Sequence, residues 1–298
     1  LSLIDVERFL VEPFTNEKFN ILMSDLIQDA FYVKGRPNRG RIATIRQISE
    51  VIIRKILNYS QEEFVTLGNH KVSEELKLSG NEHPLLNEAI KYIKKHGNDC
   101  SHTQLILDVS DEALAKAEEH LFNLYSYIFF NFFKKNTFGS NDEIMRLFSA
   151  LPPKVRYTTL RTLYESYDSH NVNVIDKLVL SMLKAFGEKK AMDWIFDNEV
   201  KLLVLDTSGI TRGSIGNHQN MYDLCLERVA EVSNVIKRNG PLYKSFEQAT
   251  EFYKSLDRLS SNSPENIEFN SLMDFAYLGR LSETNPRLDK ISEYFIVG

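Results

Sequence analysis

Cysteine and proline are scarce in this chain of 298 residues, and each shortage narrows the class of protein. Cys100 and Cys225 are too few for a disulfide framework or a cysteine-rich zinc site, so we expect a reducing, cytoplasmic setting. The chain has only eight prolines, and long stretches therefore contain no helix breaker. This composition favours helices over most of the sequence.

Long apolar runs and a positive net charge are also lacking. No run approaches the roughly 18–20 apolar residues of a membrane span, and the nearest candidate, residues 121–133, contains three polar side chains. We therefore expect no membrane segment. No secretory signal is visible, although position 1 is Leu rather than Met. The formal net charge of −5 argues against a basic protein that coats nucleic acid, but it leaves a local basic site open.

Apolar residues recur at helical spacing through most of the chain, which predicts an all-α protein. One example is the stripe Ile42, Ile45, Ile48 and Ile52. The expected helices cover residues 3–10, 16–31, 42–57, 61–79, 85–93, 111–135, 143–150, 153–167, 172–186, 189–198, 221–237, 243–259 and 266–278. Residues 201–206 form one strand-like run, which also fits the end of a helix.

The polar, glycine-containing residues 138–142 predict a domain boundary. We expect an N-terminal helical domain over residues 1–138 and a C-terminal helical domain of unknown role over residues 139–298. Residues 121–133 are apolar nearly all round a helix, so this helix needs neighbours on several sides. It is expected to be the central helix of the first domain or part of a homodimer interface, and we predict a homodimer.

The densest group of reactive side chains is residues 94–102, Lys-Lys-His-Gly-Asn-Asp-Cys-Ser-His. Gly97 and Asn98 are the residue types that most easily end a helix, so a turn is expected there. Histidine acts as acid or base near neutral pH, and lysine stabilises negative charge. The alternative is that His102 caps the next segment and that the lysines are merely solvated.

A basic segment precedes this group. Residues 34–55 contain seven Lys or Arg and a single acid, Glu50. We expect Arg39 and Arg41, in a turn-rich loop, to bind phosphate, which makes affinity for nucleic acid sensitive to salt. Arg46 and Glu50 are four residues apart and lie on one helix face. They form either a solvated pair or a pair that points into a polar cleft.

Two further candidate sites have weaker patterns. The glycine-bearing residues 209–218 lie before a helix and could cradle a phosphate, but they lack the ending of a P-loop, and a surface loop fits better. His96, Asp99, Cys100 and His102 are metal-ligand types, yet there is no second cluster elsewhere in the sequence. We therefore expect no metal and no other cofactor.

The pattern around residues 94–102 resembles the signature of the HEPN superfamily, the higher-eukaryote and prokaryote nucleotide-binding domains. That family is a four- or five-helix bundle with an Arg-x(4–6)-His motif. Many members are metal-independent ribonucleases of toxin, phage-defence and RNA-processing systems. A variant branch in defence and restriction-associated proteins has a basic residue shortly before Gly-Asn and a His after it. Gly97, Asn98 and His102 match this pattern, and Lys94 stands where the branch usually has Arg. The resemblance covers roughly residues 15–137.

The resemblance implies an RNA-cleaving effector, in phage defence or a stress response, with a regulatory or inhibitor protein as a further partner. His102 is then the acid or base, and Asn98 orients the substrate. The phosphate cations are Lys94, Lys95 and His96. The helix that carries Arg46 and Glu50 is similar to an Arg-x-x-x-Glu helix of the branch.

One departure from the family pattern concerns Gly97, which stands five residues before His102 where catalytic members carry Arg. This difference keeps a second function open, a non-catalytic module that binds RNA, a nucleotide or a protein partner. A purely structural helical adaptor is a third class. The three classes are separated by whether Arg46, the lysines and His102 converge in one basic cleft.

Overall fold

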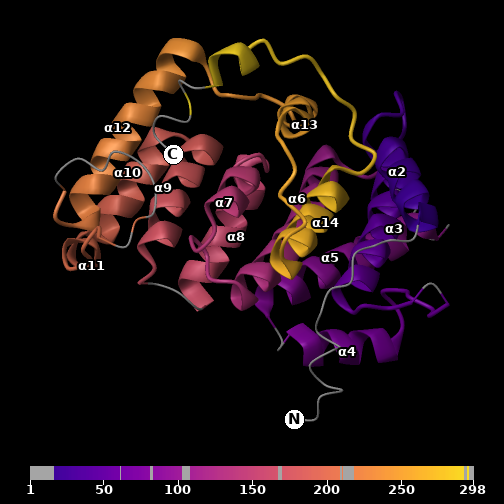
Figure 1. Ribbon diagram of the computed structural model, residues 1–298. Coiled ribbons are helices and arrows are strands. Elements are labelled where there is room, and N and C mark those ends of the chain that lie inside the picture. Colours follow the sequence, from indigo (N-terminus) through magenta and orange to yellow (C-terminus); the bar gives the residue numbers. More distant parts are fainter. Residues whose placement is uncertain are drawn as a thin grey trace. The chain divides into compact units, whose positions relative to one another are not determined.

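The computed structural model describes residues 17–60, 62–80, 83–102, 108–166, 170–208, 210, 218–291 and 294 (Figure 1). These residues form α-helices joined by turns and loops, and no strand occurs among them. The helical content is 72%, so the prediction of an all-α protein is confirmed. Across the same residues, every helix is too short or too polar to cross a lipid bilayer.

The chain divides into two compact units. Unit 1 contains residues 1–128 and 261–280, and unit 2 contains residues 129–260 and 281–298. The predicted domains, 1–138 and 139–298, stay a prediction. The contacts place α14 (Pro264–Tyr277) with the N-terminal helices, which no signal in the sequence indicated.

Unit 1 is organised around α3 (Asn38–Ile56), which packs against both α2 and α5. Ile42, Ile45, Ile48 and Ile52 of α3 are completely buried, and burying such a side chain stabilises the fold by about 1.5–3 kcal/mol. This packing explains why α3 and α5 lie side by side (Figure 1). The other helices of this unit are α2 (Glu17–Phe31), α4 (His70–Gly80), α5 (Pro84–Ser101), most of α6 (Asp111–Lys135) and α14.

The chain after α14 approaches α2 very closely. Gly279 has a φ of +70°, and a Cβ at this position would lie 2.6 Å from the Cα of Ser24. The guanidinium of Arg280, which is 7% exposed, lies 4.3 Å from the ring centre of Phe31. These contacts tie α14 to the N-terminal helices and account for its place in unit 1.

The aromatic half of α6 is buried within the chain. Phe129, Phe130, Phe132 and Phe133 are between 1% and 6% exposed. In unit 2 the Phe133 ring meets Phe138 at 4.8 Å and Phe148 at 5.2 Å between ring centres. The homodimer was predicted because one bundle was expected to leave this run uncovered. That premise is wrong, so the apolar run no longer argues for a dimer.

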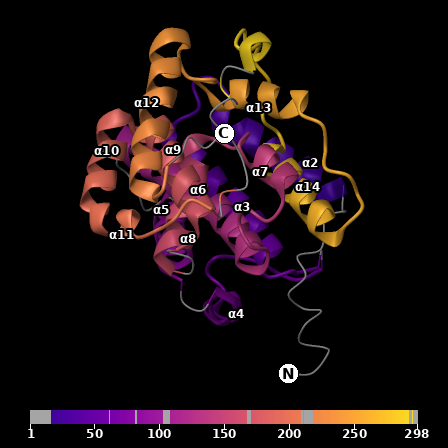
Figure 2. The same ribbon diagram turned by 60° about the vertical axis from the view of Figure 1, so that its left-hand side comes forward.

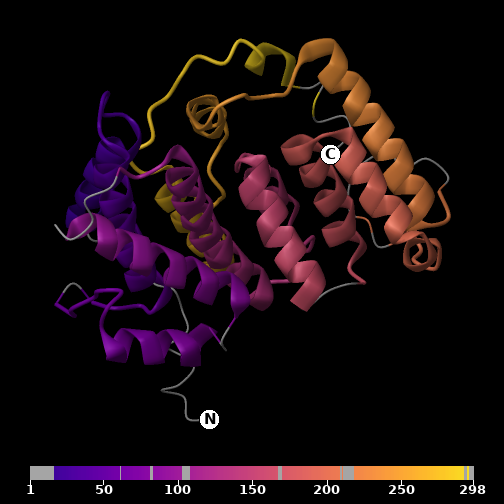
Figure 3. The same ribbon diagram turned by 180° about the vertical axis from the view of Figure 1, so that it is seen from behind.

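Unit 2 is organised around α9 (Val172–Phe186), which packs against α8, α10 and α12 (Figures 2 and 3). Asn171 begins this helix, because its side-chain oxygen accepts from the backbone N–H groups of Asn173 and Val174. The remaining helices are α7 (Asp142–Phe148), α8 (Pro153–Ser166), α10 (Glu188–Asp197), α11 (Glu199–Leu203), α12 (Met221–Asn239), α13 (Phe246–Ser255) and η1 (Leu288–Lys290).

The strand-like reading of residues 201–206 is wrong. The first three of these residues end α11, which follows α10 after a break at Asn198. Leu202 is completely buried and belongs to the core of α9, α10 and α12. The run thus finishes a helix, as its alternative interpretation proposed, with Leu202 facing inward and Leu203 and Val204 exposed.

Candidate active site

The reactive residues 94–102 lie on a continuous helix. α5 runs through Gly97 to Ser101, and the backbone N–H of His102 still donates to the carbonyl of Asn98 at 3.1 Å. The helix ends at His102, whose backbone is extended with φ −105° and ψ 150°. The predicted turn at Gly97 and Asn98 is therefore wrong.

Gly97 serves the packing of α5 against α3. A Cβ at position 97 would lie 2.7 Å from both the Cβ and the Cδ of Arg46. The Arg46 side chain crosses the backbone of α5 at this point, and only glycine leaves room for it. Glycine inside a helix costs about 1 kcal/mol relative to alanine, and the close contact between the helices offsets that cost.

Gly97→Ala is expected to lower the free energy of unfolding by about 1–3 kcal/mol, as overpacking of a buried site does. Alanine by itself stabilises a helix by about 1 kcal/mol relative to glycine. A net decrease in the free energy of unfolding would therefore come from the steric conflict with Arg46. Urea unfolding followed by circular dichroism measures the change. The control is Gly68→Ala, where a Cβ meets only Thr66 Oγ1 at 3.8 Å. A Gly97→Ala protein as stable as wild type contradicts the close approach.

Lys94, Asn98 and His102 follow one another at intervals of four residues, so they form one stripe along α5. We call this set the 94–98–102 stripe. Lys94 and Asn98 are half-buried, and His102 is exposed. Within the described ranges, none of the three side chains makes a hydrogen bond or an ion pair. An ammonium, an amide and an imidazole are thus open to a ligand on one face.

His96 lies on a different flank of α5, facing α6. Its ring is 4.1 Å from that of Tyr92, which in turn lies 4.6 Å from the ring of His120. Burial, and then the positive charge of Lys95, lowers the pKa of His96. Its imidazole is therefore neutral at pH 7 and does not act there as a phosphate cation. The structure does not bring His96 together with the stripe.

Lys95 is also separate from the 94–98–102 stripe. It is exposed, and consecutive residues of an α-helix are about 100° apart around the axis. Of the five residues predicted as catalytic, the structure therefore groups Lys94, Asn98 and His102 and separates Lys95 and His96 from them.

Arg46 and Glu50 form a partly buried ion pair rather than a solvated one. The Nε of Arg46 lies 3.4 Å from the Glu50 carboxylate, and the two side chains are 17% and 21% exposed. Glu50 also accepts from the backbone N–H of Leu67 at 3.1 Å, and Arg46 donates to Thr66 Oγ1 at 3.4 Å. The pair thus holds the segment before α4 against α3 and keeps Arg46 over Gly97.

Arg39 is bound to the end of α5. Its Nε donates to the carbonyl of Cys100 at 2.9 Å, and its Nη2 donates to the carbonyl of His102. The last carbonyls of a helix have no partner within the helix, so the guanidinium satisfies groups that would otherwise need water. Arg39 lies in the first turn of α3, not in the predicted loop, and it positions His102 through the backbone.

Arg41 has a similar structural role at the end of α2. Its Nε donates to the carbonyl of Ala30 at 2.7 Å, and its Nη2 lies 2.7 Å from the Glu118 carboxylate of α6. The sequence does not reveal this acid partner, because Glu118 is 77 residues away. Arg41 is thus neutralised within the protein and offers little charge to a phosphate.

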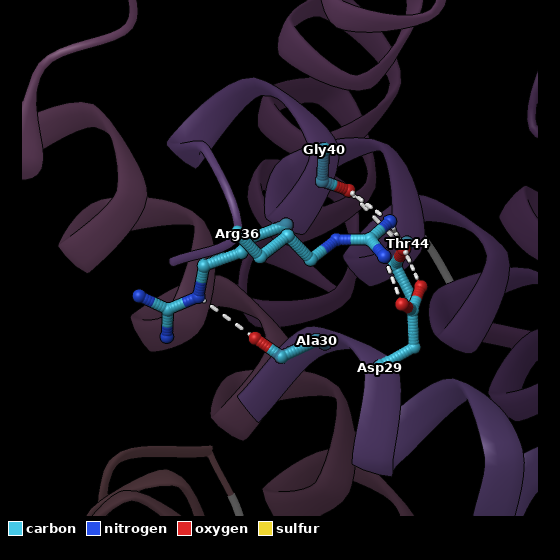
Figure 4. A network of polar contacts seen from close by, with 6 residues as sticks. Asp29, Ala30, Arg36, Gly40 and Thr44 are labelled. Atoms are coloured by element: carbon cyan, nitrogen blue, oxygen red, sulfur yellow. Dashed lines mark hydrogen bonds and ion pairs between the residues drawn. The ribbon is translucent and has the colours of Figure 1, made fainter. Parts of the chain in front are cut away.

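Arg36 is held in the same way beside Arg41. Figure 4 shows its guanidinium between the Asp29 carboxylate, the Thr44 hydroxyl and the carbonyl of Gly40. Thr44 in turn donates to Asp29 at 2.8 Å. Lys55, at the other end of the segment, is 2% exposed, and burial lowers its pKa to about 8. The positive charge of residues 34–55 is therefore largely used inside the fold.

Arg41→Glu is expected to lower the free energy of unfolding by about 1–3 kcal/mol, since it removes a charged hydrogen bond and places two carboxylates together. Urea unfolding measures this loss. Lys34→Glu is the matched control, because Lys34 is exposed and has no partner in the part of the chain that the structure describes. Equal stability of the two variants would contradict a structural role for Arg41. RNA binding by Arg41→Glu should therefore be measured only after the variant has been shown to be folded, because unfolding alone would abolish binding.

The other two candidate sites gain no support. Residues 209 and 211–217 of the glycine-bearing loop lie outside the described residues, and His218 beside them pairs with Glu227. In the described part of the chain, no three His, Cys, Asp or Glu side chains gather to hold a metal ion. Cys100 and Cys225 are both buried and free.

Comparison of the chain with protein-family models, with curated proteins and with solved structures gives no match. The resemblance to the HEPN superfamily therefore rests on the motif residues alone. The function has to be argued from the side chains of α3 and α5.

Proposed function

We propose that the chain is a metal-independent endoribonuclease whose active site is the 94–98–102 stripe. The observation that carries this proposal is the helical spacing of Lys94, Asn98 and His102, with all three side chains open to a ligand among the described residues. The resemblance of the motif to the HEPN signature supports RNA as the substrate. It also supports a role in phage defence or a stress response.

Each side chain of the stripe meets one requirement of RNA cleavage without a metal. The imidazole of His102 takes the proton of a ribose 2′-OH, and the 2′-oxygen attacks the adjacent phosphorus. Lys94 stabilises the charge that develops on the phosphoryl oxygens, and the Asn98 amide orients the substrate. The 5′-oxygen leaves and takes a proton from water. The products carry a 2′,3′-cyclic phosphate and a 5′-hydroxyl.

Arg46 of α3 lies against the motif from outside α5. Its side chain crosses α5 at Gly97, one residue before Asn98 and within one turn of Lys94. Gly97 is the position at which catalytic members of the family carry arginine, so the Arg46 side chain lies beside that position, with its charge paired to Glu50. The ion pair with Glu50 keeps this guanidinium in place.

A second function, a non-catalytic module that binds RNA, a nucleotide or a protein partner, is favoured by the single imidazole of the stripe. Cleavage needs an acid as well as a base, whereas binding needs neither. Binding without turnover would therefore identify this second function.

Incubation of purified protein with total RNA, followed by mapping of the new ends, tests the proposal. We expect cuts that leave 2′,3′-cyclic phosphates, and we expect the same cuts in the presence of a chelator. Cleavage that stops on chelation contradicts the metal-independent mechanism. Retention of intact RNA on a filter with the protein supports the second function. RNA that is neither cleaved nor retained contradicts the ribonuclease and leaves, of the second function, only a nucleotide or a protein as the ligand.

A further inference from the structure

Phe64 is an exposed aromatic side chain on the segment that joins α3 to α4, and the proposed ribonuclease mechanism does not use it. It is 75% exposed, more than any other phenylalanine that the structure describes. Its ring makes no aromatic contact within the described ranges. Single exposed apolar residues are common on proteins, so Phe64 is informative only through what lies beside it.

The backbone close to Phe64 is fixed to α3 by two hydrogen bonds. The backbone N–H of Leu67 donates to the Glu50 carboxylate at 3.1 Å, and the hydroxyl oxygen of Thr66 accepts from Arg46 at 3.4 Å. Leu67 is also buried, so it anchors the segment in the core of unit 1. Phe64 is two residues before Thr66 and therefore lies on an anchored segment near the Arg46 guanidinium.

This anchored segment, residues 62–69, lies on a side of α3 that faces away from α6. Arg41 of α3 pairs with Glu118 of α6. Arg46 follows five residues later, about 140° further round the helix axis. Because Arg46 binds Thr66, the segment and α6 are on different sides of α3.

The 94–98–102 stripe lies on the corresponding side of α5. His96 faces α6, where its ring belongs to the same aromatic group as a histidine of α6. Lys94 and Asn98 are each two residues away from His96, which places them about 160° from it round the axis. The Arg46 side chain lies against α5 between these two positions in the sequence and extends to residues 62–69. The stripe and Phe64 thus lie on one side of the α3–α5 pair.

The stripe side of α5 also carries an additional positive charge. Lys91 is exposed, and neither it nor Lys94 makes an ion pair in the part of the chain that the structure describes. Residues 91, 94, 98 and 102 lie within about 80° of one another round the axis, and the acids Glu88 and Asp99 of α5 lie outside this arc. The row is about 16 Å long. A stacked strand has one phosphate per about 3.4 Å, so the row is long enough for several nucleotides.

We propose that the substrate is single-stranded RNA, with one base stacked on Phe64 and backbone phosphates bound by Lys91 and Lys94. This inference rests on the proposed ribonuclease site. Every base has a π-face, so an exposed phenyl ring beside a row of cations binds single strands with little regard to sequence. A duplex does not fit, because its bases stack on each other and cannot reach a ring on the protein surface.

Fluorescence anisotropy with a 2′-O-methyl oligonucleotide measures this binding apart from cleavage, because a methylated 2′-oxygen cannot attack the phosphorus. Wild type is expected to bind the single strand more tightly than the same strand in a duplex. Phe64→Ala should raise the dissociation constant of the single strand about 5- to 150-fold, the range for removal of one stacked base. The affinity for the duplex should change much less.

Phe64→Trp and Phe64→Leu separate stacking from simple apolar contact. The tryptophan variant should bind at least as well as wild type, whereas the leucine variant should bind like Phe64→Ala because it has no π-face. Phe196→Ala is the matched control, since it removes a 53% exposed ring from α10 of unit 2, and it should bind like wild type. Lys91→Ala should weaken binding and lower the salt dependence by about one ion.

The outcomes of this experiment separate the stacking contact from the ribonuclease itself. Wild-type affinity of Phe64→Ala, Phe64→Leu or Lys91→Ala for the single strand overturns the proposal, even if the protein cleaves RNA. A preference of wild type for the duplex overturns it as well. Binding of a single strand that depends on Phe64, by a protein that cleaves no RNA, supports the stacking contact and contradicts only the ribonuclease.

Discussion

His102→Ala is expected to cleave RNA about 10²–10⁴-fold more slowly than wild type, the usual cost of losing a general acid or base. The imidazole is exposed at the end of α5 and makes no hydrogen bond or ion pair within the described part of the chain. Its loss should therefore leave the fold intact. Lys94 and Asn98 still contact the substrate, so RNA binding should fall much less than turnover. End mapping gives the rate, and filter binding gives the affinity.

His70→Ala is the matched control for this experiment, because the His70 side chain is 86% exposed and lies on α4, away from the stripe in sequence. It should cleave like wild type. Cleavage of RNA by His102→Ala at the wild-type rate would contradict the proposed mechanism. Unfolding of His102→Ala would instead show a structural histidine.

Lys94→Ala and His96→Ala then identify the residue that stabilises the phosphate. Lys94→Ala is expected to slow cleavage, because the ammonium is on the stripe. His96→Ala is expected to retain cleavage, because its ring packs against Tyr92 on another flank of α5. The reverse result would move the site to the face of α5 that packs on α6.

Lys184→Met is expected to be more stable than wild type at pH 7, by at most about 5 kcal/mol. This limit follows from a pKa that falls from 10.5 in the unfolded chain to about 7 in the folded one. The side chain is only half-buried, so solvent screening reduces the value. Thermal or urea unfolding in chloride measures the difference.

The pH dependence of this difference has a definite sign. Between pH 7 and 10.5 the unfolded chain holds the Lys184 proton and the folded chain has lost it, so wild-type stability rises with pH in this window. Lys184→Met lacks that rise, and its advantage should shrink as the pH increases. Other groups, including Lys55 with a pKa of about 8, titrate in both proteins and cancel in the comparison. A difference that does not change with pH would contradict the buried charge.

The helices were predictable because the buried side of a helix places apolar residues at a regular spacing in the sequence. The stripe from Ile42 to Ile52 predicted α3, and the same four residues are completely buried. The apolar run 121–133 predicted a helix with neighbours on several sides, which α6 has. Its neighbours belong to the same chain, however, and a period in one segment does not say which other segment covers it.

The candidate site was predictable only in part. The spacing of Lys94, Asn98 and His102 was visible in the sequence. Because a turn was expected at Gly97, this spacing did not predict that the three residues share one helix face. An uninterrupted helix turns intervals of four residues into one face, whereas a turn would have scattered them. The arginines show the opposite case. Arg39 and Arg41 looked free for phosphate, and their partners lie 61 and 77 residues further along the chain.

By itself, the sequence determined that this protein is helical and which side of each long helix faces inward, because local spacing encodes both. Only the tertiary structure decided that Gly97 leaves room for the Arg46 side chain and that Arg39 and Arg41 bind helix-end carbonyls and a carboxylate of the protein itself. These contacts depend on which helices pack against each other. Residues that meet in this way can be far apart in the sequence, and no repeating pattern in the sequence identifies them as partners.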